Sequence, residues 1–255
     1  MRMWALVIVA IAQLMVHPGQ AAPPSPSGDR FVEAQRAYDS GDYGSALNLY
    51  AAMAREHPRQ AEVFFNLGNT LSRLGRLGSA IAAYHFVLLI NPRDADAKAN
   101  LRFIQSRAGL SAPNHTVAER IAGWLSYAEW KTLCLTLWWV FCTAWIVHWI
   151  SAGKVVQAKL IGRAVGILLL AALVGLGETW KAINHPLVVV RTTGAKALFA
   201  PLETATPHFD APEGLTARLL QQNDAWVEIS AEHRNGWLPR SAVHIVRLDD
   251  GIEFE

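Results

Sequence analysis

A block of small and turn-forming residues occurs twice in the first half of this chain, 34 residues apart. The segment Gly41-Asp42-Tyr43-Gly44-Ser45-Ala46 recurs as Gly75-Arg76-Leu77-Gly78-Ser79-Ala80. Two aromatic positions and a proline recur with the same spacing, as Phe31 and Phe65, Tyr50 and Tyr84, Pro58 and Pro92. A period of this length indicates a stack of similar units, because one unit alone is too small to bury its apolar face.

Each unit has the pattern of two helices. In the second copy the small and apolar residues follow the 3.6-residue helical period, with Phe64, Leu67, Gly68 and Leu71 on the first helix and Ala80, Tyr84 and Val87 on the next. Gly75 would turn the chain between these helices, and Asn91-Pro92 would end the second. The pattern therefore resembles the tetratricopeptide repeat, a module that usually binds other proteins.

The resemblance predicts an α-helical repeat domain at 29–108, made of two units and a further packing helix that carries Ala97, Leu101 and Ile104. Arrays of this kind usually need about three units for stability. We therefore expect the array to be marginal alone, or to be completed by a partner or by self-association. Gly68, Ala80 and Tyr84 are expected in its core.

In tetratricopeptide proteins the first helix of each unit lines a concave groove. Carried over by the 34-residue spacing, the resemblance implies a protein-binding groove made of Phe31, Gln35, Tyr38, Glu62, Phe65, Asn69 and Arg73. Asn69 and Arg73 share a helix face and could hold a peptide backbone or carboxylate. The alternative is that these are only exposed polar positions. The carboxylate-clamp variant of the family is disfavoured, because only Asn66 fits its pattern.

The N-terminal segment 1–22 has the composition of a secretory signal peptide. Arg2 supplies a positive charge, an apolar run follows, and Ala21 ends a small-x-small cleavage pattern. An uncleaved N-terminal anchor is the alternative. Either form would place the repeats outside the cytoplasm.

Two apolar segments in the middle of the chain predict a membrane hairpin. After a linker at 109–131, the sequence between Lys131 and Lys154 holds no Asp, Glu, Lys or Arg over 22 residues. That length covers about 33 Å, enough for the hydrocarbon core. We therefore expect a first transmembrane helix at 132–152, a cytoplasmic turn at 153–159 and a second helix at 160–178. For the second helix, a buried core helix is the alternative.

The charges flanking these segments predict their orientation. The stretch 151–163 carries Lys154, Lys159 and Arg163 without an acidic residue, which places the turn in the cytoplasm. Trp124, Trp130 and Trp180 would then lie near the outer membrane interface. Cys134 and Cys142 fall in the first apolar run and are expected to be apolar filler, not a disulfide.

The last quarter of the chain predicts a small all-β domain at 186–248. Short β-rich runs separated by turn residues lie at 187–191, 195–201, 216–221, 226–230, 236–239 and 244–246. Trp226-Val227, a turn and Gly236-Trp237-Leu238-Pro239 resemble the bacterial SH3-like barrel. Trp226 and Trp237 are candidates for a peptide- or glycan-binding surface, although an inward core role is favoured. An acidic tail follows at 249–255.

The order of these parts resembles the BatE-type proteins of aerotolerance operons. That resemblance implies an envelope protein that works beside membrane proteins with von Willebrand factor A domains and a MoxR-type ATPase. The predicted fold class is thus a multidomain membrane protein, with α-helical repeats, two transmembrane helices and an all-β SH3-like barrel. It would sit in the bacterial inner membrane with its repeats and barrel in the periplasm.

Sequence patterns for chemistry are missing. The chain has no phosphate-binding glycine-lysine loop, no H-E-x-x-H motif and no nucleophile beside an evident base. Its formal net charge of +2 argues against a nucleic-acid footprint. We therefore expect no enzyme activity, cofactor, metal or nucleic-acid partner. The predicted function is a non-catalytic scaffold; the alternatives are a peptidoglycan-binding or cell-wall accessory factor and an accessory factor of an envelope enzyme complex.

Overall fold

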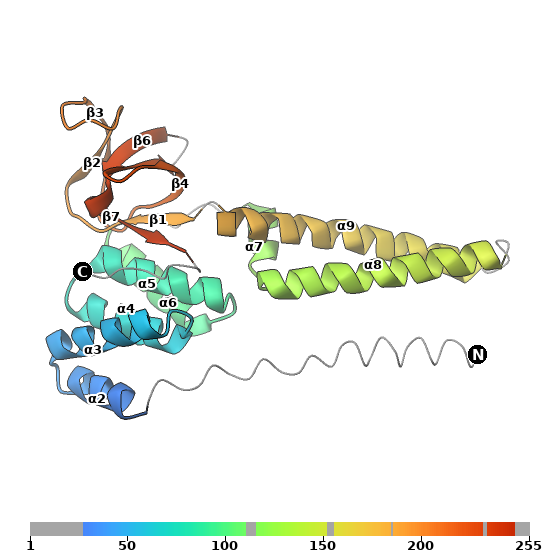
Figure 1. Cartoon of the computed structure of the whole chain (residues 1–255), viewed down its shortest axis with the longest axis horizontal. Coiled ribbons are helices and arrows are strands. Elements are labelled where there is room, and N and C mark those ends of the chain that lie inside the picture. The colour runs from blue at the N-terminus through green and yellow to red at the C-terminus, as the bar shows by residue number, and fades with distance from the viewer. Residues whose placement is uncertain (1–27, 111–115, 152–155, 185, 232–233, 248–255) are drawn as a thin grey trace.

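The computed structural model describes residues 28–110, 116–151, 156–184, 186–231 and 234–247. The predicted signal peptide at 1–22 and the acidic tail at 249–255 lie outside these residues. The predicted cytoplasmic turn is described only from residue 156. Figure 1 shows three parts: a stack of short helices, a β-sheet above it, and a long helical hairpin that projects from both.

Five helices fill the region predicted as a helical repeat. They are α2 (Gly28–Asp39), α3 (Tyr43–Glu56), α4 (Ala61–Arg73), α5 (Leu77–Ile90) and α6 (Ala95–Arg107). Gly41, Gly75 and Gly109 follow α2, α4 and α6, and each has a positive φ, at 82°, 76° and 68°. Glycine adopts this conformation without a Cβ penalty and so ends a helix. The third glycine shows that α6 is the first helix of a third unit.

Helix crossings explain why the array stops there. Ala34 is fully buried in the first unit, and a Cβ on Gly68 would lie 3.0 Å from the Tyr84 ring in the second. Ala80 and Tyr84 are buried as expected. The equivalent residue in the third unit is Arg102, which is exposed. A side chain of that size leaves no room for a helix packed as α5 packs on α4.

The C-terminal part is a seven-stranded antiparallel sheet in the order β3-β2-β6-β5-β4-β1-β7. Its strands are β1 (Leu187–Val190), β2 (Ala195–Leu198), β3 (Pro207–Ala211), β4 (Thr216–Gln222), β5 (Trp226–Ala231), β6 (Arg234–Pro239) and β7 (Val243–Val246). A 3-10 turn at Arg240–Ala242 precedes β7. Strand β3 was not predicted. Among the described strands no pairing joins β3 to β7, so closure into a barrel stays a prediction.

The sheet packs on the second helix of the second unit. Val189 of β1 and Val246 of β7 belong to the same buried cluster as the repeat core. Glu213, between β3 and β4, accepts a hydrogen bond from the Gly78 N–H of α5 at 2.8 Å. The Ser79 hydroxyl and His244 Nε2 lie 2.8 Å apart. The chain's own sheet thus covers α5. That the array is marginal alone, or is completed by a partner or by self-association, stays a prediction.

The hairpin is made of α8 (Tyr127–Ile150) and α9 (Val156–Asn184). A Ser126–Glu129 capping box starts α8 five residues before the predicted span, and α9 continues six residues beyond its predicted end. The predicted linker contains a short helix, α7 (Val117–Ala122), with its own capping box from Thr116 and Glu119. Both capping boxes fit the S/T-x-x-E pattern and were visible in the sequence.

Small residues of α9 bring the two long helices together. A Cβ on Gly175 would lie 2.6 Å from the Trp130 indole, and one on Gly166 would lie 3.4 Å from the Phe141 ring. Trp130 is only 5% exposed and donates its Nε1–H to the Ala122 carbonyl at 3.0 Å. It therefore packs against α7 and α9, and its place near the outer membrane interface stays a prediction. Trp124 and Trp180 are exposed.

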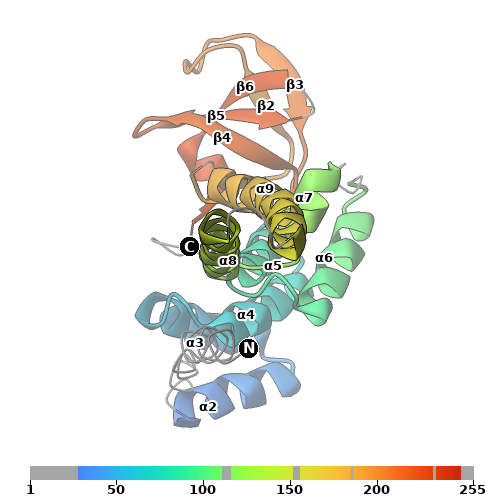
Figure 2. The same cartoon turned by 90° about the vertical axis from the view of Figure 1, so that its right-hand side faces the viewer.

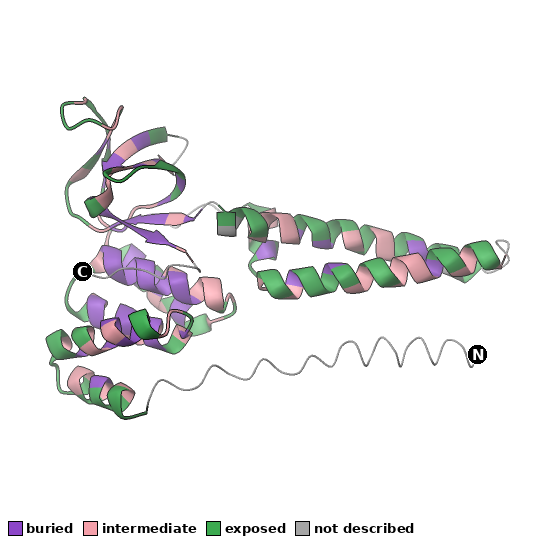
Figure 3. Ribbon diagram, in the orientation of Figure 1, coloured by how far each residue is buried: buried purple, intermediate pink, exposed green. Residues whose placement is uncertain are grey.

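Both long helices are apolar and exposed along most of their length (Figure 3). The candidate spans, Tyr127–Ile150 and Lys159–Lys181, have mean hydropathies of 1.7 and 2.2. Each is long and apolar enough to cross a membrane. Cys134 and Cys142 lie in the first of them as free thiols.

Candidate functional site

The residues predicted to line a protein-binding groove lie on the first helices of the first two units, α2 and α4. Phe31, Gln35 and Tyr38 come from α2, and all three are half-buried. The α4 residues are Glu62, Phe65, Asn69 and Arg73, of which Glu62 and Arg73 are exposed. We use the name groove for these seven residues.

Four groove residues make the same contacts in both units. The Phe31 and Phe65 rings lie edge-on against Tyr50 and Tyr84, with centroids 5.9 and 6.0 Å apart. The hydroxyls of these tyrosines donate to Gln35 Oε1 at 3.2 Å and to Asn69 Oδ1 at 2.6 Å. Phe31, Gln35, Phe65 and Asn69 are therefore fixed by the second helix of their own unit.

Burial changes the acidity of these tyrosines. Desolvation raises the pKa of Tyr50 to about 12, and the same cause raises the pKa of Tyr84 further. Both hydroxyls remain protonated donors at physiological pH. They hold Gln35 and Asn69 in one orientation, which gives the groove wall a fixed shape.

Hydrogen bonds also join neighbouring first helices. Asn69 Oδ1 accepts a second bond, from Asn100 Nδ2 of α6 at 3.0 Å. An amide oxygen has two lone pairs, so its acceptor capacity is used within the protein. Arg73 Nε donates to the Tyr38 hydroxyl at 3.3 Å, which links α4 to α2. The two residues of the expected Asn69–Arg73 site therefore have different roles. The Asn69 side chain is bonded within the repeat array, whereas Arg73 presents an exposed guanidinium.

The third unit adds residues that the sequence pattern did not assign to the groove. Phe103 stands 34 residues after Asn69, and Arg107 stands 34 residues after Arg73. Phe103 is 60% exposed, which is unusual for a phenylalanine in a packed helix. The sequence signal that could have identified Phe103 and Arg107 is the 34-residue spacing, which continues from Gly75 to Gly109. Phe103 and Arg107 are exposed on α6, as Arg73 is on α4, and we call these two α6 residues the extension of the groove.

The two candidate tryptophans lie on the sheet face opposite its core. Val227, Ile229 and Leu238 are fully buried on the inner face, whereas Trp226 and Trp237 alternate with them and are half-buried. Trp237 pairs with Glu228 on one side and Leu198 on the other. Neither tryptophan belongs to the buried core, contrary to the inward role that the sequence favoured.

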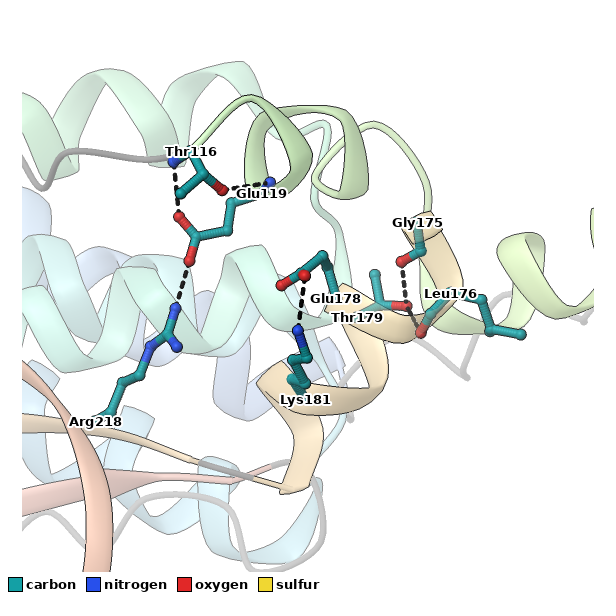
Figure 4. A network of polar contacts seen from close by, with 8 residues as sticks. All are labelled: Thr116, Glu119, Gly175, Leu176, Glu178, Thr179, Lys181 and Arg218. Carbon is teal, nitrogen blue, oxygen red and sulfur yellow. Dashed lines mark hydrogen bonds and ion pairs between the residues drawn. The ribbon is translucent and has the colours of Figure 1, made fainter. Parts of the chain in front are cut away.

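Ion pairs hold the repeats and the sheet to the base of the hairpin. Arg93, after α5, contacts Glu129 in the first turn of α8 at 2.6 Å. Arg218 of β4 pairs with Glu119 of α7 (Figure 4). The same close-up shows Thr179 donating to the carbonyls of Gly175 and Leu176, and Lys181 paired with Glu178. Viewed along the hairpin, α8 and α9 project toward the viewer, with the sheet above them and the repeats below in the picture (Figure 2).

The described residues offer little for catalysis or metal binding. Within residues 28–247, gaps excepted, no group of three or more His, Cys, Asp or Glu side chains is placed to hold a metal ion. Exposed cationic and aromatic side chains lie instead on α4 and α6, at Arg73, Phe103 and Arg107. Side chains of these types are common in surfaces that bind peptides.

Comparison with known proteins supports the repeat assignment. Residues 37–102 match the family model described as tetratricopeptide repeat. The match begins in α2 and ends in α6, and it includes Tyr38, Phe65, Asn69 and Arg73. No match was found among curated proteins. The repeats indicate binding to other proteins.

Proposed function

We propose that this protein is a membrane-anchored, non-catalytic scaffold that captures partner proteins in the groove and its extension. The observation that carries the proposal is the exposure of Arg73 on α4 and of Phe103 and Arg107 on α6, which are first helices of their units in a tetratricopeptide array. Two guanidiniums can each hold a carboxylate, and the exposed Phe103 ring offers an apolar contact. The partner segment would carry acidic side chains together with an apolar one.

The proposed anchor is the hairpin, crossing the inner membrane twice. Its exposed apolar surface supports insertion, since such an area in water would be costly. The repeats and the sheet lie at the same end of the hairpin (Figure 1), as an out-in-out path requires. The basic residues near the turn and the N-terminal signal favour a periplasmic location for both.

The physiological setting that we propose is a BatE-like envelope complex. The order of signal, repeats, hairpin and β-domain is similar to that family, and this similarity is the support. The partners would be membrane proteins with von Willebrand factor A domains, working with a MoxR-type ATPase. An SH3-like barrel would complete the periplasmic part.

The test is capture from membranes of the native host with the tagged full-length chain. Phe65→Ala combined with Arg73→Ala, and Phe103→Ala combined with Arg107→Ala, should each reduce recovery of the partner at least about tenfold, as for central contacts of an interface. Glu33→Ala combined with Arg36→Ala, on the exposed side of α2, is the matched control. Undiminished capture by both groove variants would contradict the proposal.

A second function is favoured by the outward tryptophans of the sheet. Half-buried aromatic side chains beside Glu228 could form a platform for glycan or peptide, which would make the protein a cell-wall accessory factor with the repeats as spacer. Binding of the full-length protein to purified peptidoglycan sacculi, lost in Trp226→Ala and Trp237→Ala, would support this alternative. If the protein instead has an accessory role in an envelope enzyme complex, capture with the tagged full-length chain should recover subunits of that enzyme.

A further inference from the structure

The short helix α7 carries exposed apolar side chains beside the base of the hairpin. Val117 and Ile121, one helical turn apart, are both exposed, and Trp124, three residues further on, is 66% exposed. We call these three residues the α7 stripe. Residues three and four apart share one side of a helix, so the three side chains lie together. An exposed group of this kind, unlike a single apolar residue, marks a contact surface.

The stripe points away from the sheet. Glu119 of α7 pairs with Arg218 of β4, and this ion pair identifies the side of α7 that faces the sheet (Figure 4). Val117 and Ile121 each stand two residues from Glu119, which is about 200° around a helix of 3.6 residues per turn. The stripe is therefore on the side of α7 opposite the sheet.

Contacts with the hairpin set the level of α7 along the candidate spans. The Ala122 carbonyl accepts a hydrogen bond from Trp130 Nε1–H at 3.0 Å, and the Trp130 indole lies against Gly175 of α9. Lys181 ends the candidate span six residues after Gly175, so α7 ends about 9 Å inside that span. Amphipathic helices at a membrane interface bury their apolar side about 5–10 Å into the boundary between headgroups and acyl chains. The level of α7 thus matches that of an interfacial helix.

The hairpin surface at the same level is also apolar and exposed. Leu133 of α8 lies one turn from Trp130, and Leu173 of α9 lies two residues from Gly175; both are exposed. Trp180, next to the end of the second candidate span, is exposed as well. The stripe therefore continues the surface that the hairpin would present to acyl chains. This continuity favours lipid as the occupant of the stripe.

Free cations next to the stripe add a preference for anionic lipid. In segments 116–131 and 172–184 every carboxylate is in an ion pair: Glu119 with Arg218, Glu129 with Arg93, and Glu178 with Lys181. Arg120 and Lys131 are exposed, and within the described ranges neither has an ion-pair partner. A guanidinium and an ammonium at a membrane surface are attracted to the phosphates of anionic lipids.

We infer that the α7 stripe lies in the membrane interface at the base of the hairpin, with Arg120 and Lys131 on the phosphates of anionic lipids. The inference rests on the proposed membrane anchor and adds a third bilayer contact to its two spans. Apolar burial and electrostatic attraction together bind interfacial helices. Because Glu119 is joined to the sheet and Glu129 to the repeats, this contact holds both parts at a fixed height above the membrane.

Spin labels on the full-length protein test the position of the stripe. Chains with Cys134→Ala and Cys142→Ala carry one nitroxide, at Ile121→Cys, at Leu170→Cys in the second candidate span, or at Asn48→Cys on the exposed surface of α3. In nanodiscs of phosphatidylcholine and phosphatidylglycerol, collisions with oxygen are compared with collisions with a water-soluble nickel chelate. We expect the labels at 121 and 170 to be reached by oxygen and protected from nickel. The label at 48 should show the reverse.

Removal of the cations tests the choice of lipid. Arg120→Gln combined with Lys131→Gln should increase nickel access at position 121 at least about fivefold, since each cation near an anionic surface contributes about that factor. Replacing phosphatidylglycerol with phosphatidylcholine should have the same effect on the chain that keeps both cations. Lys98→Gln combined with Arg102→Gln, which removes two exposed cations of α6, is the matched control and should change nothing.

Three results would overturn the inference. Nickel access at 121 equal to that at 48, with 170 protected, would show that the hairpin is inserted and α7 is not. Exclusion of both oxygen and nickel at 121 would show that a second copy or a partner protein covers the stripe. Nickel access that changes with neither the cations nor the lipid would remove anionic headgroups from the contact. Nickel access at 170 would contradict the anchor itself, which separates failure of the proposed function from failure of this inference.

Discussion

The two repeat units have nearly the same sequence pattern but different surroundings. In the first unit, α3 buries one face through Ala46, Tyr50 and a few neighbours. In the second unit, every residue of α5 from Gly78 to Tyr84 is buried. The helix α5 has the groove helices on one side and the sheet on the other. The 34-residue period thus specifies which segments form helices. Contact with the sheet makes α5 of the second unit more buried than α3 of the first.

The start of the second helix shows the difference most clearly. In the first unit Asp42 caps α3 by accepting a hydrogen bond from the Ser45 N–H at 3.0 Å. Hydrogen bonding to the Ser45 side chain first, and then to its N–H, lowers the pKa of the Asp42 carboxyl. The equivalent residue in the second unit is Arg76, which makes no side-chain cap. Glu213 of the sheet accepts from α5 instead. A local cap has been replaced by a contact between two parts of the chain.

The largest expected effect comes from the helix crossing that both units share. In Gly68→Leu the new side chain would overlap the Tyr84 ring, because even a Cβ at this position would lie 3.0 Å from that ring. We expect a loss of about 3 kcal/mol or more, as for a severely overpacked core. Thermal melting followed by circular dichroism would measure it, and an unchanged melting curve would contradict the repeat alignment.

The same glycine-to-alanine substitution should have different effects on stability in the two units. A Cβ on Gly78 would lie 2.3 Å from the Val190 carbonyl oxygen, whereas one on Gly44 meets only Asp42 Oδ1 at 3.6 Å. Gly78→Ala should cost about 2 kcal/mol, because backbone of the sheet must move. Gly44→Ala should be neutral or stabilising by up to about 1 kcal/mol. Equal melting of the two variants would show that the sheet does not dock on α5.

The replaced cap predicts a smaller effect. Glu213→Ala leaves the α5 N-terminus without its acceptor and should cost about 1 kcal/mol, as for loss of an N-cap. Hydrogen exchange should accelerate in β1 and β7 as well as in α5. Asp42→Ala should change exchange in α3 only. If both variants affect only their own helix, Glu213 does not couple the sheet to the repeats.

The free energy of unfolding should fall gradually at high pH, because each unit contains a buried tyrosine hydroxyl. Tyr50 has its pKa raised to about 12 by burial, and the pKa of Tyr84 is raised further. Above about pH 10 the unfolded chain loses these protons while the native state keeps them, so native stability falls as pH rises. Denaturant titrations from about pH 9 to about pH 12 should show this decline. Tyr50→Phe and Tyr84→Phe should each make it shallower; identical slopes would contradict the buried tyrosine hydroxyls.

The sequence predicted most elements of the fold, because periodicity and turn residues are local. It did not predict β3, whose Pro207 and His208 resemble a loop, or α7, which is only six residues long. It could not show the contact of Glu213 with α5, since residues 135 positions apart in the chain meet there. In the groove the spacing located Arg73, but it did not reveal that Asn69 is already bonded to Tyr84 and Asn100.

The most direct test of the scaffold proposal is site-specific photo-cross-linking in membranes of the native host. A photoreactive residue at Phe103 should form an adduct with a partner protein, and Arg73→Glu combined with Arg107→Glu should abolish it. The same residue at Phe199, which directly follows β2 and is 61% exposed, should form no such adduct. Adducts only from Phe199, or only with cell-wall fragments, would contradict the account and assign the function to the sheet.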